Sequence, residues 1–208
     1  MNKARIEALS DGVFSIAMTI LIIEIHVPQI ADGAYSIMSL WNALVGIFPH
    51  LASYVVSFTV LAMYWTSHHA LFHFFTKSVN RMLVQLNMLY LMFLVFIPFS
   101  TNLVGTYPTN IFAVWVYGAN IIMMGVIAFV MFTYSIRSND IDLHEISSRV
   151  ITQAKIRLLL TPSFAFIAMI VATISIPLSL FFFIFPVIFN LIPGSLNATE
   201  RFFGVTIR

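Results

Sequence analysis

The stretch RIEALSDGVFSIAMTILIIEI, residues 5–25, decides the fold class. Eleven consecutive uncharged residues, 13–23, lie between Gly12 and Glu24. In an α-helix they span about 16 Å, whereas the hydrocarbon core of a bilayer is about 30 Å thick. The segment is therefore apolar enough for a membrane helix, yet it carries a carboxylate near each end, Asp11 and Glu24.

The composition of the whole chain agrees with a membrane protein. The 208 residues are 60% hydrophobic and 9% charged, against about 25% charge in soluble domains. A membrane β-barrel would need strands that alternate polar and apolar residues, but the runs here are apolar at successive positions. The absence of cysteine excludes disulfides, thiolate catalysis and cysteine-based metal sites. A net charge of +2 without a basic stripe argues against a nucleic-acid partner.

Six hydrophobic segments predict an all-α polytopic membrane protein with six transmembrane helices in a single domain, 1–208. The segments run from about 5–27, 39–66, 82–103, 108–134, 158–174 and 177–192. All ten basic residues then fall on one side of the membrane, which the positive-inside rule assigns to the cytosol. Both termini are therefore predicted to be cytosolic. The same topology predicts a soluble cytosolic loop at about 135–157, in which SNDIDLHEISSR (138–149) is expected to begin a short interfacial helix.

A helical wheel of the first segment separates two stripes. One holds Gly12, Ile16, Thr19, Ile20, Ile23 and Val27, and the other holds Asp11, Ser15, Met18 and Ile22. If only the spacing of the isoleucines is considered, ordinary packing against a neighbouring helix explains the stripe. The carboxylates at both ends instead favour a helix whose ends stand in water and whose middle forms a thin dry barrier, as in a hydrophobic gate. One copy cannot surround a pore, but a symmetric ring of copies can.

Three blocks of sequence resemble a known family. The first, Arg5-Ile-Glu-Ala-Leu9-Ser10-Asp11, resembles the Arg-x-x-x-Phe-Ser-Asp signature of the transmembrane protein 175 family of potassium channels. The others are YWTSHHALFHFF (64–75) and LNMLYLMFLVFIPFSTNL (86–103). The resemblance covers about the first hundred residues. Two positions depart from the family pattern: Leu9 replaces Phe, and Asn80 replaces an expected acidic residue.

The resemblance implies a potassium-selective cation channel in the cell membrane, built as a homotetramer of six-helix units. It implies that the helix at about 5–27 lines the pore, without a carbonyl selectivity filter. Ile16 would form the constriction and Ile23 a second apolar ring, while Thr19 contributes to selectivity and Ser15 offers a further oxygen. The implied partners are K⁺ ions, the lipid bilayer and copies of the same chain, and no cofactor is expected.

The resemblance implies that Arg5 and Asp11 hold the pore helix to its neighbours. Both residues are expected to belong to a polar network on the cytosolic side, for which a direct role in gating is the alternative. Its members are Arg5, Ser10, Asp11, Trp65, His68, His69 and Asn87. At the other end of the helix, Glu24 either concentrates cations at the outer mouth or is an interfacial carboxylate in solvent. The two interpretations explain Glu24 equally well.

The other polar residues do not indicate a metal site, a proton relay or an enzyme. His69 and His73 lie one helical turn apart, which suits a metal, but no carboxylate accompanies them and no metal is expected. His50 is interpreted as a packing histidine rather than a proton relay. Asp11 beside a histidine lacks the further groups that an enzyme needs, so no enzyme is expected.

The alternative to a channel is a secondary transporter or proton-coupled carrier, which typically has broken helices and a midplane binding site.

Overall fold

The computed structural model describes residues 2–30, 36–76, 78–137 and 148–191, and within these ranges every regular element is an α-helix. The helices are α1 (Lys3–Ile23), α2 (Ile37–Gly46), α3 (Phe48–Phe75), α4 (Arg81–Val95), α5 (Ile97–Thr106), α6 (Ile111–Arg137), α7 (Ser148–Val171) and α8 (Ile176–Leu191). The prediction of an all-α fold is therefore confirmed.

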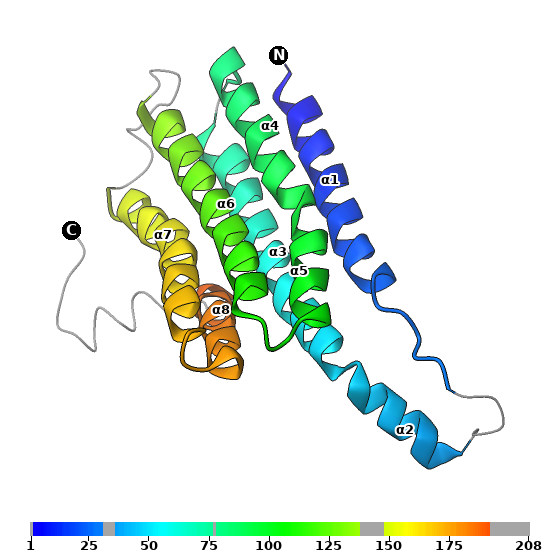
Figure 1. Cartoon of the computed structure of the whole chain (residues 1–208). Coiled ribbons are helices and arrows are strands. Elements are labelled where there is room, and N and C mark those ends of the chain that lie inside the picture. Colours follow the sequence, from blue (N-terminus) through cyan, green and yellow to red (C-terminus); the bar gives the residue numbers. More distant parts are fainter. Residues whose placement is uncertain (1, 31–35, 77, 138–147, 192–208) are drawn as a thin grey trace.

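The helices form a bundle with α1 on one side and α7 and α8 on the other (Figure 1). α1 packs against α3, α4 and α5, while α6 packs against α4, α5 and α7. α2 extends away from the bundle and has no buried residue. Because the described helices pack on one side of α1 only, its other face is not covered by any described part of this chain.

Prolines divide two of the predicted spans. The span predicted at 39–66 is the pair α2 and α3, which meet at a bend of 51° just before Pro49. The span predicted at 82–103 is the pair α4 and α5, which meet at Phe96, with Pro98 in the first turn of α5. Proline has no N–H and is tolerated in the first turn of a helix. The junction before Pro49 is a sharp bend, whereas α4 and α5 together form one membrane-length helical segment, Arg81–Thr106.

Several helices extend beyond the predicted hydrophobic windows. α3 continues to Phe75 instead of ending near residue 66, and α7 begins at Ser148 instead of near residue 158. Helix therefore occupies both ends of the segment predicted as a loop, 135–157. Most of the short helix expected at 138–149 lies outside the described residues. The differences arise because hydropathy marks the part of a helix that suits lipid and not the residue at which the helix ends.

Among the described residues, four helical segments are long and apolar enough to cross a membrane: α1, the combined Arg81–Thr106, α6 and α7. The bent pair α2 and α3 adds a fifth if the two helices form one span, and α8 is a shorter apolar helix. The chain is thus a multi-pass membrane protein. The count of six spans and the cytosolic position of both termini remain predictions.

Two glycines allow α7 to approach α6 closely. A Cβ atom at Gly118 would lie 2.6 Å from Cγ of Met169, and one at Gly125 would lie 2.8 Å from Cγ of Pro162. Small residues permit such close packing between membrane helices. The contact fixes α7, which contains Pro162, against the centre of the bundle.

Candidate pore helix and its anchoring network

α1 has one buried and one exposed face. The buried side chains recur every three or four residues, as expected for one side of a helix: Ile6, Ser10, Phe14, Ala17 and Leu21. On the opposite face Ile16 is 57% exposed and Ile23 is 70% exposed. A large apolar face is therefore available in the single chain, at the end of the bundle where α1 lies (Figure 1).

The structure places the four predicted pore residues on this exposed face. Ile16, Ile23, Thr19 and Ser15 are all exposed. Of the remaining stripe positions, Gly12 is exposed, Ile20 is half-buried and Val27 lies beyond the end of α1. The stripe from the helical wheel thus corresponds to the uncovered side of α1.

The two hydroxyls on this face are bonded to their own helix. Ser15 Oγ donates to the carbonyl oxygen of Asp11 at 2.8 Å. Thr19 Oγ1 lies 2.8 Å from the carbonyl oxygen of Ile16 and 3.0 Å from that of Ser15. Because each hydroxyl proton is directed at the backbone, the lone pairs of each oxygen remain free for another partner. Such an oxygen can approach a cation.

On the buried face a hydrogen-bonded group connects α1 to α3 and α4. Asn87 Nδ2 donates to Ser10 Oγ at 3.1 Å, and Asn87 Oδ1 lies 2.7 Å from His68 Nε2. Since the amide oxygen of Asn87 only accepts, His68 carries its proton on Nε2 in this arrangement. All three side chains are buried, so removal of Asn87 would take a hydrogen bond from both Ser10 and His68.

A second, exposed group lies beside the first. Trp65 Nε1 donates to Asp11 Oδ1 at 2.9 Å, and the ring of His69 stacks on that of Trp65 with centroids 5.8 Å apart. Arg5 is exposed, and its side chain makes no hydrogen bond or ion pair within the described ranges. The structure therefore brings together every expected network residue except Arg5.

The other end of α1 is fixed to α5. Asn102 Nδ2 donates to Glu24 Oε2 at 2.8 Å. Glu24, His26 and His50 line a cavity of about 390 Å³. His50 packs closely on α5, since a Cβ atom at Gly105 would lie 2.8 Å from its Cδ2 atom. This contact agrees with the interpretation of His50 as a packing histidine. No cluster of three metal-binding side chains occurs in the part of the chain that the structure describes.

Sequence reasoning missed several polar contacts. Asn102 was not recognised as the partner of Glu24, although it follows the Pro-Phe-Ser-Thr segment of the family resemblance. A buried chain of hydroxyls joins Thr101 to Ser57 at 2.7 Å and Ser57 to Tyr117 at 2.9 Å. The signal available in the sequence was a polar residue inside an apolar span, since a buried hydroxyl needs a partner.

Asn80, the departure from the family pattern, has two functions in the structure. Its side-chain oxygen accepts a hydrogen bond from the backbone N–H of Leu83 at 3.0 Å and thereby caps α4. Its amide nitrogen donates to the hydroxyl of Tyr134 in α6 at 2.6 Å. An aspartate would retain the cap but could not donate to Tyr134 as the asparagine does.

Comparison with known proteins agrees with this geometry. Residues 5–98 match the sequence model of the family described as "Endosomal/lysosomal potassium channel TMEM175". The resemblance to the TMEM175 family is confirmed. The matched region contains α1, α3 and α4, and hence both hydrogen-bonded groups that hold α1.

Two relatives illustrate the similarity to TMEM175 proteins. The chain is 44% identical over 108 residues to a potassium channel of Streptomyces collinus, covering 51% of this chain and 50% of that protein. It is 34% identical over 111 residues to the endosomal/lysosomal proton channel TMEM175 of Gallus gallus, covering 51% of this chain and 22% of that protein. The aligned region thus spans half or less of these relatives. Both are named as channels and neither as an enzyme.

The fold extends the similarity beyond the aligned sequence. The crystal structure of a homologue of the lysosomal potassium-selective channel TMEM175 from Chamaesiphon minutus superposes with a TM-score of 0.77 at 27% identity. The superposition covers 90% of this chain and 95% of that one. The second half of the chain therefore has the same architecture, although the sequence resemblance covered only the first.

Proposed function

We propose that the chain is one subunit of a potassium-selective cation channel of the cell membrane, in which four copies surround a pore lined by α1. The observation that carries the proposal is the uncovered face of α1, on which Ile16, Thr19 and Ile23 follow one another along the helix. A closed ring of identical helices buries such a face. The names of the bacterial and animal relatives support the channel assignment.

In the proposed pore, the Ile16 side chains form the constriction and the Ile23 side chains a second apolar ring. A ring of isoleucines has no polar atom for an ion, so ions pass only when the ring dilates enough to admit water. The oxygens of Thr19 and Ser15 then contact a partly dehydrated cation. Potassium loses water more readily than sodium, so a ring of hydroxyls favours it moderately without a rigid carbonyl cage.

The network around Ser10 and Asn87 supports this role because it resists displacement of α1. The face opposite the proposed pore is held by a buried hydrogen bond from Asn87 of α4 to Ser10, and Asn87 is itself bonded to His68 of α3. The Trp65 bond to Asp11 secures the middle of α1, and the Asn102 bond to Glu24 secures its C-terminal end. Glu24, near the outer end, places a negative charge that raises the local concentration of cations.

The second candidate is a secondary transporter or proton-coupled carrier. The helix breaks before Pro49 and Pro98 favour it, because carriers commonly use discontinuous helices near their binding sites. The channel is the better-supported proposal, since both breaks lie outside α1 and the exposed face of α1 has only small hydroxyls near its centre.

Reconstitution of the purified chain in planar bilayers and liposomes tests the proposal. A channel gives unitary current steps that reverse toward the potassium equilibrium potential, and a carrier gives saturable coupled flux without steps. Native mass spectrometry of the same preparation should give four copies. A functional monomer, or flux without unitary steps, would contradict the proposal, and a parallel proton-flux measurement separates potassium permeation from proton permeation.

A further inference from the structure

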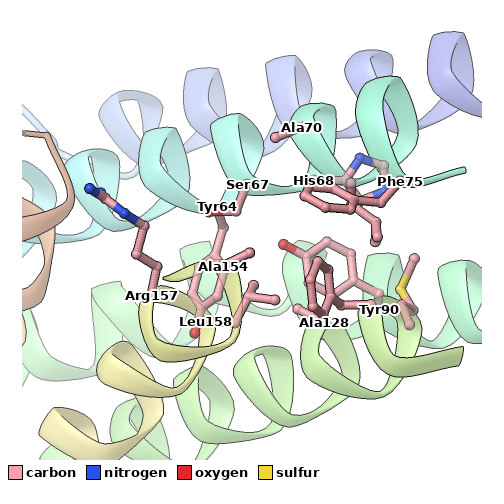
Figure 2. Close-up of a pocket in the computed structure, with 13 residues that line it drawn as sticks. Tyr64, Ser67, His68, Ala70, Phe75, Tyr90, Ala128, Ala154, Arg157 and Leu158 are labelled. Atoms are coloured by element: carbon pink, nitrogen blue, oxygen red, sulfur yellow. The ribbon is translucent and has the colours of Figure 1, made fainter. Parts of the chain in front are cut away.

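A candidate ligand-binding cavity lies away from the exposed face of α1. A partly open cavity of about 120 Å³ lies between α3, α4, α6 and α7 (Figure 2). Its wall is mainly apolar and includes Leu71, Phe75, Ala128, Met131, Ala154 and Leu158. Closed apolar cavities of about this size take up benzene-sized molecules, and this wall is apolar in the same way.

One fully buried polar atom in this wall has no hydrogen-bond partner. Tyr90 is 1% exposed, and its hydroxyl makes no hydrogen bond. Figure 2 shows this hydroxyl directed toward the other side chains that line the cavity. Tyr64, which lines the same cavity, instead donates to the carbonyl oxygen of Ile121 at 2.9 Å. A buried hydroxyl without a partner is costly, so a ligand that bonds to Tyr90 gains an interaction that the empty cavity lacks.

The polar groups at the edges of the cavity favour a neutral ligand. Arg157 Nη1 donates to the carbonyl oxygen of Asn190 at 2.9 Å, and Figure 2 shows its guanidinium on the side away from Tyr90. His68 Nε2 bonds to Asn87. Because both basic side chains are directed to protein partners, the cavity offers no charged group to balance an ionic ligand.

We propose that this cavity binds a neutral amphiphile of about the size of a benzene ring, with an apolar body among the α6 and α7 side chains and one oxygen bonded to the hydroxyl of Tyr90. The apolar body is held by burial in the cavity. The single oxygen gives selectivity for an alcohol, a phenol or a carbonyl compound over the corresponding hydrocarbon.

The site also contacts the residues on which α1 rests. Phe14 of α1 packs against His68 at a centroid distance of 5.8 Å and against Tyr90 at 6.1 Å. Both rings line the cavity on another side. A ligand in the cavity is therefore one side chain away from α1, and, given the proposed channel function, its binding changes the ion flux.

The test uses 4-fluorophenol as the probe and fluorobenzene as a matched probe without the hydroxyl, with fluorine NMR on the purified full-length chain. We expect saturable binding of 4-fluorophenol that is about 3- to 10-fold tighter than that of fluorobenzene, the factor given by one hydrogen bond. Tyr90→Phe should remove this difference, and it should fold because it deletes only an unpartnered hydroxyl. Ala128→Leu should abolish binding of both probes by filling the cavity.

The control is Val126→Leu, a change on the exposed side of α6 outside the cavity wall, which should leave both affinities unchanged. Non-saturable partitioning of 4-fluorophenol, a preference that survives in Tyr90→Phe, or normal binding to Ala128→Leu would each overturn the proposal. The binding readout does not depend on ion flux, so failure of this site is distinguishable from failure of the channel proposal. A flux assay with and without 4-fluorophenol then tests the coupling, which unchanged flux at saturation would refute.

Discussion

Asn102 donates a hydrogen bond of 2.8 Å to the carboxylate of Glu24 and thereby joins the end of α1 to α5. At the other end of the apolar segment, Trp65 donates to Asp11 at 2.9 Å. Each acidic residue that brackets the short stretch thus has a donor from a neighbouring helix. Because a carboxylate near hydrocarbon needs such a partner, these bonds explain how an apolar segment of only about 16 Å can end in charge on both sides.

The Glu24 contact predicts a measurable contribution to stability. Asn102→Leu should lower the free energy of unfolding by about 1 kcal/mol, since it removes a partly exposed hydrogen bond to a charged acceptor. Titration with a denaturing detergent, followed by helical circular dichroism, measures the loss. Glu24→Gln keeps an acceptor for Asn102 and should be less destabilising. Equal stability of Asn102→Leu and the unchanged protein would show that the bond contributes nothing.

Ile16 provides the test of the proposed constriction. Ile16→Asn introduces an amide that attracts water into the apolar ring, and potassium flux in liposomes should rise by about 10-fold, which corresponds to about 1.4 kcal/mol of barrier.

The control is Val126→Asn, which introduces the same amide at an exposed position of α6, away from α1. It should leave the flux close to that of the unchanged protein. Similar increases in both variants would indicate a general loosening of the protein, and no increase in Ile16→Asn would remove Ile16 as the barrier.

Thr19 provides the test of selectivity. Thr19→Val keeps the shape of the side chain but removes the oxygen, so the preference for potassium over sodium should fall by about fivefold, the equivalent of one weak polar contact of about 1 kcal/mol. The reversal potential in mixed K⁺ and Na⁺ solutions measures this change. Thr19→Ser, which retains a hydroxyl, should stay close to the original ratio. Loss of selectivity in both variants would assign the effect to packing instead of the oxygen.

The Ser10–Asn87 contact predicts energetic coupling between α1 and α4. Asn87→Leu leaves the buried hydroxyl of Ser10 and the ring N–H of His68 without a partner, and Ser10→Ala leaves one amide hydrogen unbonded. In a double-mutant cycle, the combined variant should be less destabilised than the sum of the two single variants by about 1–2 kcal/mol. Additive effects would show that the two side chains do not interact.

The exposed stripe of α1 and the all-helical architecture could be predicted from the sequence because both follow from residue periodicity and hydropathy. Ile16 and Ile23 occur at spacings that place them on one side of any regular helix. The breaks before Pro49 and Pro98 were not predicted, because a proline in an apolar span is compatible with a kink, a break or a continuous helix packed against neighbours.

The polar network was harder to predict than the helices. Asp11, Trp65, His68 and Asn87 were grouped through the family resemblance and not through spacing, since hydrogen bonds between distant helices leave no local pattern. Because contacts between distant helices leave no local pattern, the sequence also did not indicate that Arg5, which was grouped with these residues, is exposed in the single chain. It also explains Asn102, whose partner is remote in sequence.

Replacement of Asn120 in α6 is expected to raise the free energy of unfolding, whereas replacement of Asn102 is expected to lower it. It is 4% exposed, and neither its amide nitrogen nor its amide oxygen has a hydrogen-bond partner. Asn120→Leu removes this unsatisfied amide and adds a better helix former, so the free energy of unfolding should rise by about 1–2 kcal/mol. The same detergent titration measures both asparagine variants. If Asn120→Leu lowers stability as Asn102→Leu does, the amide of Asn120 does not destabilise the fold.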